Sequence, residues 1–425
     1  MNIEEIYKIY LQFPSVVTDT RNIKIGDIFF ALKGPNFNGN MYAEQAVKAG
    51  AAYCICDERT DYTNEKIIYV DDSLLCMQSL AKHHRQQFNI PVIAITGSNG
   101  KTTTKELVHV VLSKKYRCYT TKGNLNNHIG IPLTILAIKN DAEIAVIEMG
   151  ANHLYEIENY CTYAMPTHGI IVNCGKAHLE GFGSEDGVRK AKGELYNYLE
   201  KNNGTIFINT DYNYLLEMSN NITNKITYGT SNAMYTGIVA NDNNFVEVKI
   251  TIGLQLQCIK TKLAGNYNLP NILSAVCIGK TFGVNDSDIK DAIENYTPSN
   301  SRSQIIKKDT NTILLDAYNA NPSSMKAAIE NFAAMDGNNK IVILGGMMEL
   351  GLESIAEHTN IINLLLQHNW KQIIVTGKDY QNLPPNILHF NNSNETAAWY
   401  KLQNFENCFI LIKGSRGMAM EKLLD

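Results

Sequence analysis

The segment between residues 95 and 106 carries the residue types and spacing best suited to chemistry. It reads Ile95-Thr-Gly-Ser-Asn-Gly-Lys-Thr-Thr-Thr-Lys-Glu106, between an apolar run (91–95) and a helical pattern (107–112). Glycines at such a strand-to-helix turn let backbone N–H groups surround a phosphate, and the helix N-terminus adds a partial positive charge. The lysine then reaches the terminal phosphates and the first threonine binds Mg²⁺. We therefore expect ATP or GTP to bind at Gly97, Ser98, Asn99, Gly100, Lys101, Thr102 and Thr103.

The spacing within this loop is unusual. The general phosphate-binding pattern has four residues between its first glycine and Gly-Lys, whereas Gly97 and Gly100 enclose only Ser98 and Asn99. The shorter loop restricts the classes of nucleotide-binding enzyme to which this chain can belong.

Two further candidates follow apolar runs. Glu148 ends the run 144–148, and an acidic residue at the carboxyl end of a parallel strand near a phosphate loop is suited to binding Mg²⁺. The alternative is a helix-capping or solvated carboxylate. His178 follows the run 169–172, and residue type alone leaves a site histidine and an ordinary surface or core histidine equally open. Lys192 lies in a basic helical segment that resembles a solvated face.

Asparagines form a third group. Asn124, Asn126 and Asn127 crowd one polar loop, where they suit either phosphate and amide contacts or simple turn formation. Asn268 and Asn271 share one face of a helix start and could hold an adenine edge or cap the helix.

The elements that must position these residues divide into three regions. Residues 1–90 mix short strands and helices and end at the linker 89–91. Residues 91–298 alternate strand and helix, which predicts a parallel sheet, and the alternating apolar pattern between Phe245 and Leu263 predicts an antiparallel strand or hairpin. A second linker at 298–301 precedes a smaller alternating region, 299–425. We expect an α/β protein with a small N-terminal domain, a central P-loop-type, mainly parallel sheet with a small antiparallel sheet, and a C-terminal Rossmann-like domain.

Composition excludes several classes of protein. The chain has 425 residues and a net charge of −4, so it has no general attraction for nucleic acid or anionic membranes. Its apolar runs are too short to span a membrane, and its first residues lack the pattern of an export signal. Nine scattered cysteines without a Cys-x-x-Cys pair indicate free thiols and a cytoplasmic location.

Taken together, these segments resemble the Mur ligase superfamily, the ATP-dependent amide ligases of peptidoglycan precursor synthesis. The short phosphate loop is that family's form of the motif, and similar segments follow in the family's order: 148–153, 177–184, 191–194, 268–271 and Ser301-Arg302. Three segments, 123–134, 316–325 and 345–351, are similar to the members that use D-alanyl-D-alanine. The Asp-Asn-Pro-Arg motif of the meso-diaminopimelate-adding members is absent from the sequence.

The resemblance implies a reaction through an acyl phosphate. ATP, with Mg²⁺, would phosphorylate the terminal carboxylate of UDP-N-acetylmuramoyl-tripeptide, and the amine of D-alanyl-D-alanine would then attack it. The implied catalytic residues are Lys101, His178 and Lys192. Thr102 and Glu148 would bind one Mg²⁺, and His178 a second, supported by Lys192 if it is carbamylated.

The resemblance also implies where the substrates bind. Asn268 and Asn271 would contact adenine, Arg302 a phosphate and Asp316 the ribose. Residues 1–90 would bind the UDP-sugar, and residues 299–425 would bind D-alanyl-D-alanine and close over ATP. The implied substrate contacts are Thr20, Arg21, Asn38, Asn124, Asn126, Asn319, Asn321, Glu349 and Arg416. Many members have Asp-Gly-His in place of Asn38-Gly39-Asn40, Asp in place of His128 and His in place of Tyr267, so those positions receive no fixed role.

Other classes fit less well. A GTPase switch needs an Asn-Lys-x-Asp guanine reader, and Asn224-Lys-Ile-Thr lacks the aspartate. A folylpolyglutamate-synthetase-like ligase would lack the N-terminal domain and the segment 316–325. A nucleotide-binding regulator would need a damaged site, but the candidate residues are present. Nothing in the sequence requires more than a monomer, and the third residue of the acceptor peptide, lysine or meso-diaminopimelate, stays open.

Overall fold

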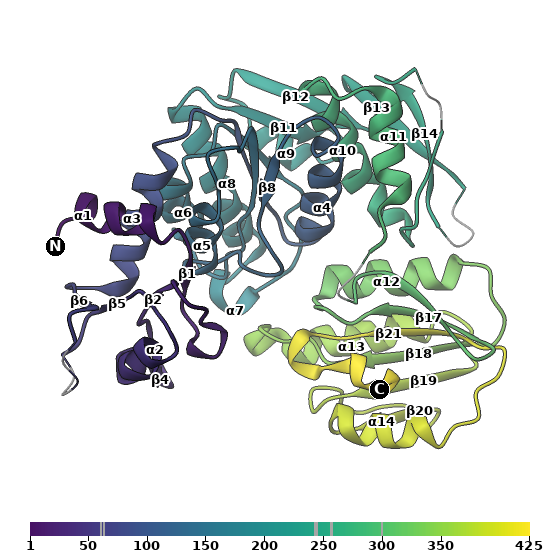
Figure 1. Ribbon diagram of the computed structural model, residues 1–425. Helices are drawn as coiled ribbons and strands as arrows, with labels where there is room; N and C mark the ends of the chain where they lie inside the picture. The colour runs from purple at the N-terminus through teal and green to yellow at the C-terminus, as the bar shows by residue number, and fades with distance from the viewer. Residues whose placement is uncertain (60–61, 63, 242–244, 256–257, 299–300) are drawn as a thin grey trace.

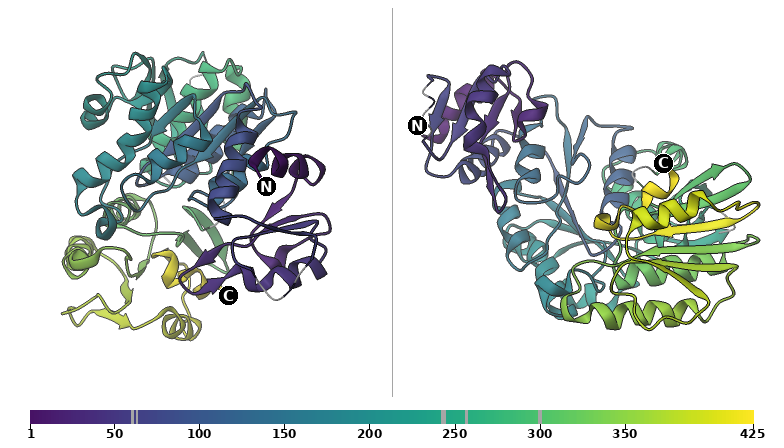
Figure 2. Two further views of the ribbon diagram at one scale, coloured as in Figure 1. Left: turned by 90° about the vertical axis from the view of Figure 1, so that its left-hand side faces the viewer. Right: turned by 90° about the horizontal axis from the view of Figure 1, so that it is seen from below.

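Three mainly parallel sheets follow one another along the chain (Figure 1). The computed structural model describes residues 1–59, 62, 64–241, 245–255, 258–298 and 301–425. Residues 299–300 of the expected second linker, and 242–244 and 256–257 in and beside the alternating segment, lie outside the described residues. The central domain lies between the other two, which extend from different parts of it (Figure 2).

In the described part of the N-terminal domain, the main sheet consists of four parallel strands in the order β1-β2-β5-β6. Its elements are α1 (Ile3–Gln12), β1 (Val16–Val17), β2 (Ile28–Phe30), α2 (Ala43–Lys48), β5 (Tyr53–Cys56), β6 (Ile67–Tyr69) and α3 (Ser73–Arg85). A short hairpin, β3 (Lys33–Gly34) and β4 (Phe37–Asn38), projects beside it.

The central sheet has nine strands among the described residues, in the order β15-β14-β13-β12-β11-β10-β7-β9-β8. Its strands are β7 (Val92–Thr96), β8 (Cys118–Thr120), β9 (Ile144–Glu148), β10 (His168–Ile171), β11 (Thr205–Asn209), β12 (Asn224–Gly229), β13 (Tyr235–Asn241), β14 (Glu247–Ile252) and β15 (Cys258–Lys260). The helices are α4 (Lys101–Leu112), α5 (Gly130–Leu136), α6 (Glu156–Ala164), α7 (Leu179–Phe182), α8 (Glu185–Lys201), α9 (Asn213–Met218), α10 (Leu269–Thr281) and α11 (Asp286–Asn295). The antiparallel part, β13 to β15, continues this sheet instead of forming a separate one.

The C-terminal sheet has the order β16-β17-β21-β18-β19-β20, and only its edge strand β16 is antiparallel to its neighbour. Its elements are β16 (Gln304–Lys308), β17 (Asn311–Asp316), α12 (Pro322–Ala334), β18 (Lys340–Gly345), α13 (Ser354–Leu365), β19 (Gln372–Thr376), β20 (Ile387–Phe390), α14 (Ser393–Lys401) and β21 (Phe409–Lys413). The predicted α/β class, with parallel sheets covered by helices, is confirmed.

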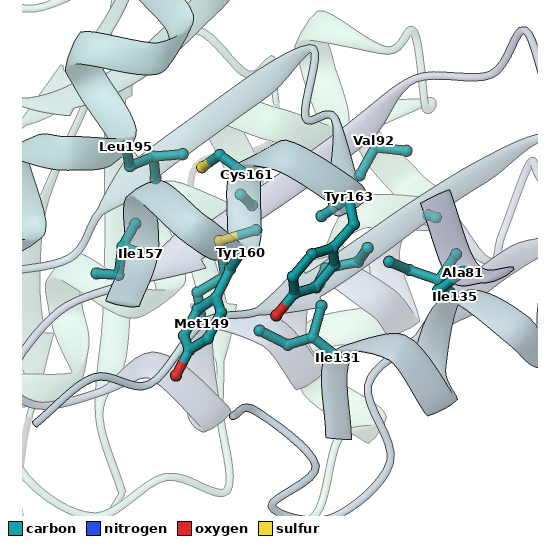
Figure 3. Close-up of a cluster of buried hydrophobic side chains, with 14 of the residues drawn as sticks. Ala81, Val92, Ile131, Ile135, Met149, Ile157, Tyr160, Cys161, Tyr163 and Leu195 are labelled. Atoms are coloured by element: carbon teal, nitrogen blue, oxygen red, sulfur yellow. The ribbon is translucent and has the colours of Figure 1, made fainter. Parts of the chain in front are cut away.

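Side chains that alternate along the central strands pack into two different hydrophobic cores, one on each face of the sheet. On one face, Ile93 and Ile95 of β7 pack with α4, α10 and α11. On the other face, Val92 and Ala94 join a cluster that includes α5, α6 and α8. This second cluster extends into the N-terminal domain through α3, whose Ala81 lies beside Ile135 of α5 (Figure 3). The first two sheets therefore share a core.

His168, the first residue of β10, is a titratable group held in an apolar setting. Its ring stacks on Phe207 with the centroids 6.0 Å apart, and its Nδ1 lies 2.9 Å from Thr167 Oγ1. Burial lowers the pKa of His168 from its ordinary 6.5 to about 4. The unfolded chain therefore binds the extra proton between these two pH values, and stability is lost as the pH falls through this window.

We expect His168 to contribute on the order of 3 kcal/mol to this loss of stability. Replacing His168 by Phe should flatten the fall of the unfolding free energy between pH 7 and pH 4, as measured by urea denaturation. Replacement of the exposed His153 by Gln is the control and should leave the slope unchanged. An identical slope in the His168 variant would contradict the assignment.

Candidate active site

The phosphate loop is the turn between β7 and α4. Gly97 and Gly100 both have positive φ, 150° and 78°. A Cβ on Gly100 would lie 2.6 Å from Asn271 Oδ1, so a larger residue is excluded by space as well as by conformation. Asn99 N donates to Asn173 Oδ1 (2.9 Å) and Ser98 Oγ donates to Gly175 O (2.8 Å), which fix the loop to the end of β10.

Lys101 begins α4 and lies folded against the loop. Its Nζ donates to the carbonyl oxygens of Gly97 (2.6 Å) and Ser98 (3.2 Å). Burial lowers the pKa of Lys101, and the nearby Glu148 carboxylate opposes this shift. The ammonium group thus lies where a phosphate bound by the loop would meet it.

Glu148, at the end of β9, is 1% exposed and faces α4. Its two oxygens accept hydrogen bonds from Thr102 Oγ1 at 3.1 and 2.9 Å, and Oε1 also accepts one from Asn126 Nδ2 at 2.8 Å. Hydroxyl and carboxylate oxygens are the ligands Mg²⁺ prefers, so Thr102 and Glu148 fit this ion. No group of three His, Cys, Asp or Glu side chains arranged for a metal occurs in the described parts of the chain. Waters and phosphate oxygens would therefore complete the coordination, as is usual for Mg²⁺.

His178 lies beside the C-terminal domain. It precedes α7 in the left-handed conformation (φ 51°) and pairs with Glu349, which has φ 62° in the loop after β18. The imidazole lowers the pKa of Glu349 through this contact. The sequence predicted both residues but gave no indication that they meet.

Lys192 lies inside α8 and is 1% exposed. Its Nζ donates to Ala151 O (3.2 Å) and lies 5.0 Å from the centre of the Phe182 ring. Burial lowers the pKa of Lys192 to about 7. The basic helical face expected from the sequence is therefore interrupted by one fully enclosed lysine.

The C-terminal domain contributes residues from one edge of its sheet, where β16 begins and the parallel strands β17 and β21 end. Arg302 lies 3.5 Å from the centre of the Tyr318 ring, and its buried Nε has no hydrogen-bond partner among the described residues. The Asp316 carboxylate accepts from Ser303 N (3.0 Å) and from Lys413 Nζ (2.5 Å). These groups leave a guanidinium available for an anion.

Further contacts, in addition to His178–Glu349, join the central and C-terminal domains directly. Asn321 Nδ2 donates to Asn99 Oδ1 of the phosphate loop at 2.8 Å, while the same side chain caps α12. Lys176 Nζ lies 2.9 Å from Glu357 Oε1. The segment 319–321, for which the resemblance implies D-alanyl-D-alanine binding, therefore contacts the phosphate loop.

A cavity of about 780 Å³ lies between these two domains. Most of the predicted residues line it: Ser98, Asn99, Gly100, Lys101, Thr102, Thr103, Asn126, Glu148, His178, Asn268, Asn271, Arg302, Asp316, Asn319 and Asn321. Among them, Asn271 Nδ2 donates to Asn268 Oδ1 (2.9 Å), so the two expected adenine contacts also hold each other.

Other predicted residues are not among those that line the cavity: Gly97, Lys192, Thr20, Arg21, Asn38, Asn124, Glu349 and Arg416. In the N-terminal domain, Arg21 pairs with Asp19 at 2.6 Å, and Asn38 donates to Glu58 Oε2 at 2.6 Å while accepting from Asn40 N. Arg416 lies 5.6 Å from the centre of the Tyr318 ring.

The sequence reasoning missed several residues that line the cavity, notably Asp211, Tyr212, Thr230 and Lys413. Asp211 follows β11 and accepts from Thr230 Oγ1 (2.7 Å), which follows β12. The rule that drew attention to Glu148, a polar residue at the carboxyl end of a parallel strand, would have found these two as well.

Comparison with known proteins gives the class. The family model for the Mur ligase middle domain matches residues 95–279, and the model described as Mur ligase, glutamate ligase domain matches residues 301–416. The chain belongs to the Mur ligase family and is an ATP-dependent amide ligase. The resemblance seen in the motifs is thereby confirmed.

Full-length relatives narrow the assignment within the family. The chain is 33% identical to the UDP-N-acetylmuramoyl-tripeptide--D-alanyl-D-alanine ligase of Bacillus subtilis, over 100% of this chain and 96% of that protein. Among solved structures it is similar to MurF from Acinetobacter baumannii, with a TM-score of 0.88 and 28% identity over 96% of this chain and 92% of that one. It is also similar to the MurF ligase of Thermotoga maritima in complex with ADP, with a TM-score of 0.82 and 26% identity over 97% of both chains. Within the described residues, no helix has the length and apolar character needed to cross a membrane.

Proposed function

We propose that this protein joins D-alanyl-D-alanine to UDP-N-acetylmuramoyl-tripeptide, with conversion of ATP to ADP and phosphate, in peptidoglycan precursor synthesis. The observation that carries the proposal is the match, over the whole chain, to a ligase of that name. The site supports it, because the phosphate loop and the Asn319–Asn321 segment line one cavity. The products are UDP-N-acetylmuramoyl-pentapeptide, ADP and phosphate.

The reaction would begin with transfer of the γ-phosphoryl group to the terminal carboxylate of the tripeptide. Lys101 and the backbone N–H groups of residues 97–103 would hold the β- and γ-phosphates, and Arg302 would bind another phosphate oxygen. Such transfer depends on alignment and charge neutralisation more than on covalent help from the protein. Magnesium, held by Thr102 and Glu148, would supply charge neutralisation on the phosphates.

His178 and Lys192 would serve the acyl side of the site. Burial lowers the pKa of Lys192 to about 7, which raises the share of neutral amine near neutral pH, and the neutral amine is the form that carbamylation requires. A carbamate on Lys192 would carry negative charge and could support a second Mg²⁺ together with His178. The Glu349 carboxylate would keep the His178 ring in place.

The two remaining substrates would approach from opposite domains. Residues 1–90 would bind the UDP-sugar, and residues 299–425, with Asn319, Asn321, Glu349 and Arg416, would bind D-alanyl-D-alanine and close over ATP. The contacts Asn99–Asn321 and Lys176–Glu357 already join two of the domains around the cavity. Closure would keep water from the acyl phosphate.

We also propose that the protein works as a monomer in the cytoplasm. Residues of this one chain line the cavity between the central and C-terminal domains. Each of the nine cysteines, all in described parts of the chain, is a free thiol, which suits the cytoplasm, where ATP is available.

The test is phosphate release from ATP and Mg²⁺, with the tripeptide acceptor and D-alanyl-D-alanine added separately and together. We expect release that needs both, together with a pentapeptide product detected by mass spectrometry. Assays with lysine or meso-diaminopimelate as the third residue will define the acceptor. Release that is independent of both substrates would refute the substrate assignment and leave the nucleotide site standing.

A further inference from the structure

Lys105 is a buried lysine that the proposed chemistry does not use. It lies on α4, one turn after Lys101, and is only 2% exposed. Its Nζ donates to Thr121 O at 2.9 Å and lies 3.7 Å from Glu106 Oε1. Burial of an ammonium group is costly, and an apolar side chain of similar length would fill the same space at lower cost. The presence of a charged side chain at this buried position therefore needs a functional explanation.

The contacts of Lys105 close a ring around the expected Mg²⁺ ligands. Glu148 N donates to Thr121 Oγ1 at 3.0 Å, and the Glu148 carboxylate accepts from Thr102 Oγ1, which returns to α4. All four side chains are buried, with exposures of 4% for Thr102, 2% for Lys105, 0% for Thr121 and 1% for Glu148. Lys105 is the member that ties α4 to Thr121.

Thr121 lies at an edge of the central sheet, where the contact with Lys105 adds a link to α4. It directly follows β8, the three-residue strand at one edge of the central sheet, so one side of this strand has no neighbouring strand among the described residues. The loop that begins at Thr121 also carries Asn126, which donates to Glu148 Oε1 at 2.8 Å. A shift of this edge relative to α4 would move Thr121 and Asn126, two of the three residues whose side chains hold Glu148.

We propose that Lys105 is a positioning residue for the nucleotide-bound Mg²⁺. By holding Thr121 O, it fixes the Glu148 carboxylate opposite the Thr102 hydroxyl. This inference rests on the proposed role of Thr102 and Glu148 in binding the metal. The ammonium donor is essential to it, so arginine should replace Lys105 better than methionine, which fills similar space without a donor.

Binding of a non-hydrolysable ATP analogue is measured by calorimetry, once with Mg²⁺ and once with EDTA. The comparison distinguishes a role in positioning the Mg²⁺ ligands from a general role in folding or nucleotide binding. We expect Lys105→Met to weaken binding about tenfold in Mg²⁺, the usual effect of removing a group that orients a metal ligand, and to leave binding in EDTA within about twofold. Lys105→Arg should retain most of the Mg²⁺-dependent gain. Lys115→Met is the control, because Lys115 Nζ also donates to backbone carbonyls, at Phe282 and Gly283, but lies beyond the C-terminal end of α4, away from the phosphate loop.

Thr121→Val tests the next link and remains informative if the Lys105 variants unfold. It removes the acceptor for Glu148 N while keeping the carbonyl that Lys105 binds, and we expect it to show the same Mg²⁺-specific loss. Equal losses with Mg²⁺ and EDTA, or a methionine variant that binds as the wild type does, would overturn the proposal. The readout needs no acceptor, so a protein that binds Mg²⁺ and ATP but ligates nothing would refute the proposed function and still test Lys105.

Discussion

Replacing Lys101 by alanine should lower the rate of phosphate release in the presence of both substrates by about 10²–10³-fold. Lys101 places a cation on the phosphate loop, with its Nζ 2.6 Å from Gly97 O and inside the cavity lining. Negative charge on the phosphoryl group is redistributed during transfer, and a fixed cation stabilises that charge more in an enclosed site than in water. Alanine removes the charge and leaves the loop glycines intact.

The variant should nevertheless fold normally. Burial lowers the pKa of Lys101, so the enclosed position disfavours the charged form, and removal of this charge by alanine should not unfold the protein. Urea denaturation of the variant checks this. Replacement of Lys115, beyond the far end of α4, by alanine is the control for loss of a lysine. A Lys101→Ala enzyme within tenfold of the wild-type rate would rule out the proposed role.

Replacing Glu148 by glutamine should produce the second large effect, a loss of about 10²-fold in rate at fixed Mg²⁺. Glutamine keeps the size of the side chain but removes the negative charge. In the wild type, Thr102 Oγ1 and Asn126 Nδ2 both donate hydrogen bonds to the Glu148 carboxylate. Glutamine replaces one of these acceptor oxygens by an NH₂ group, which is a donor. Titration of Mg²⁺ in the phosphate-release assay should show half-activation at roughly 10–100-fold higher concentration.

The control for the Glu148 variant is Glu143→Gln, because Glu143 lies one residue before β9 and is exposed. This variant should need no more Mg²⁺ than the wild type does. A Glu148→Gln enzyme with an unchanged Mg²⁺ requirement would show that the carboxylate only stabilises the loop 121–126. The effect of Lys105→Met should be smaller than that of Glu148→Gln, since Lys105 acts through the same carboxylate.

Local spacing explains what could be predicted from the sequence. The phosphate loop could be predicted because a strand, two glycines and a helix start are consecutive, and Glu148 because its apolar strand ends at it. The alternation of strand and helix in residues 91–298 and again in 299–425 was enough to predict the central sheet and the Rossmann-like C-terminal domain. These signals depend on neighbours along the chain, and folding keeps those neighbours together.

Contacts between distant segments could not be predicted in this way. His178 meets Glu349 only because the central and C-terminal domains pack together, and no local pattern records that packing. Asn38 is similar: the same residue type suits a ligand contact or a cap, and in the fold it accepts from Asn40 N. Lys192 resembled a solvated helix position because one-dimensional periodicity cannot show that its Nζ is enclosed and donates to Ala151 O.

One apolar cluster includes residues from Ile6 in α1 to Ile222 beyond α9. The N-terminal and central domains would therefore have to be exchanged together between related proteins. A graft of residues 1–90 from another ligase would have to match the packing of α3 against α5 and α6, since cores tolerate few changes in volume. The C-terminal sheet has clusters almost entirely its own on both faces. A recombinant enzyme with a new C-terminal domain is therefore easier to build than one with a new N-terminal domain.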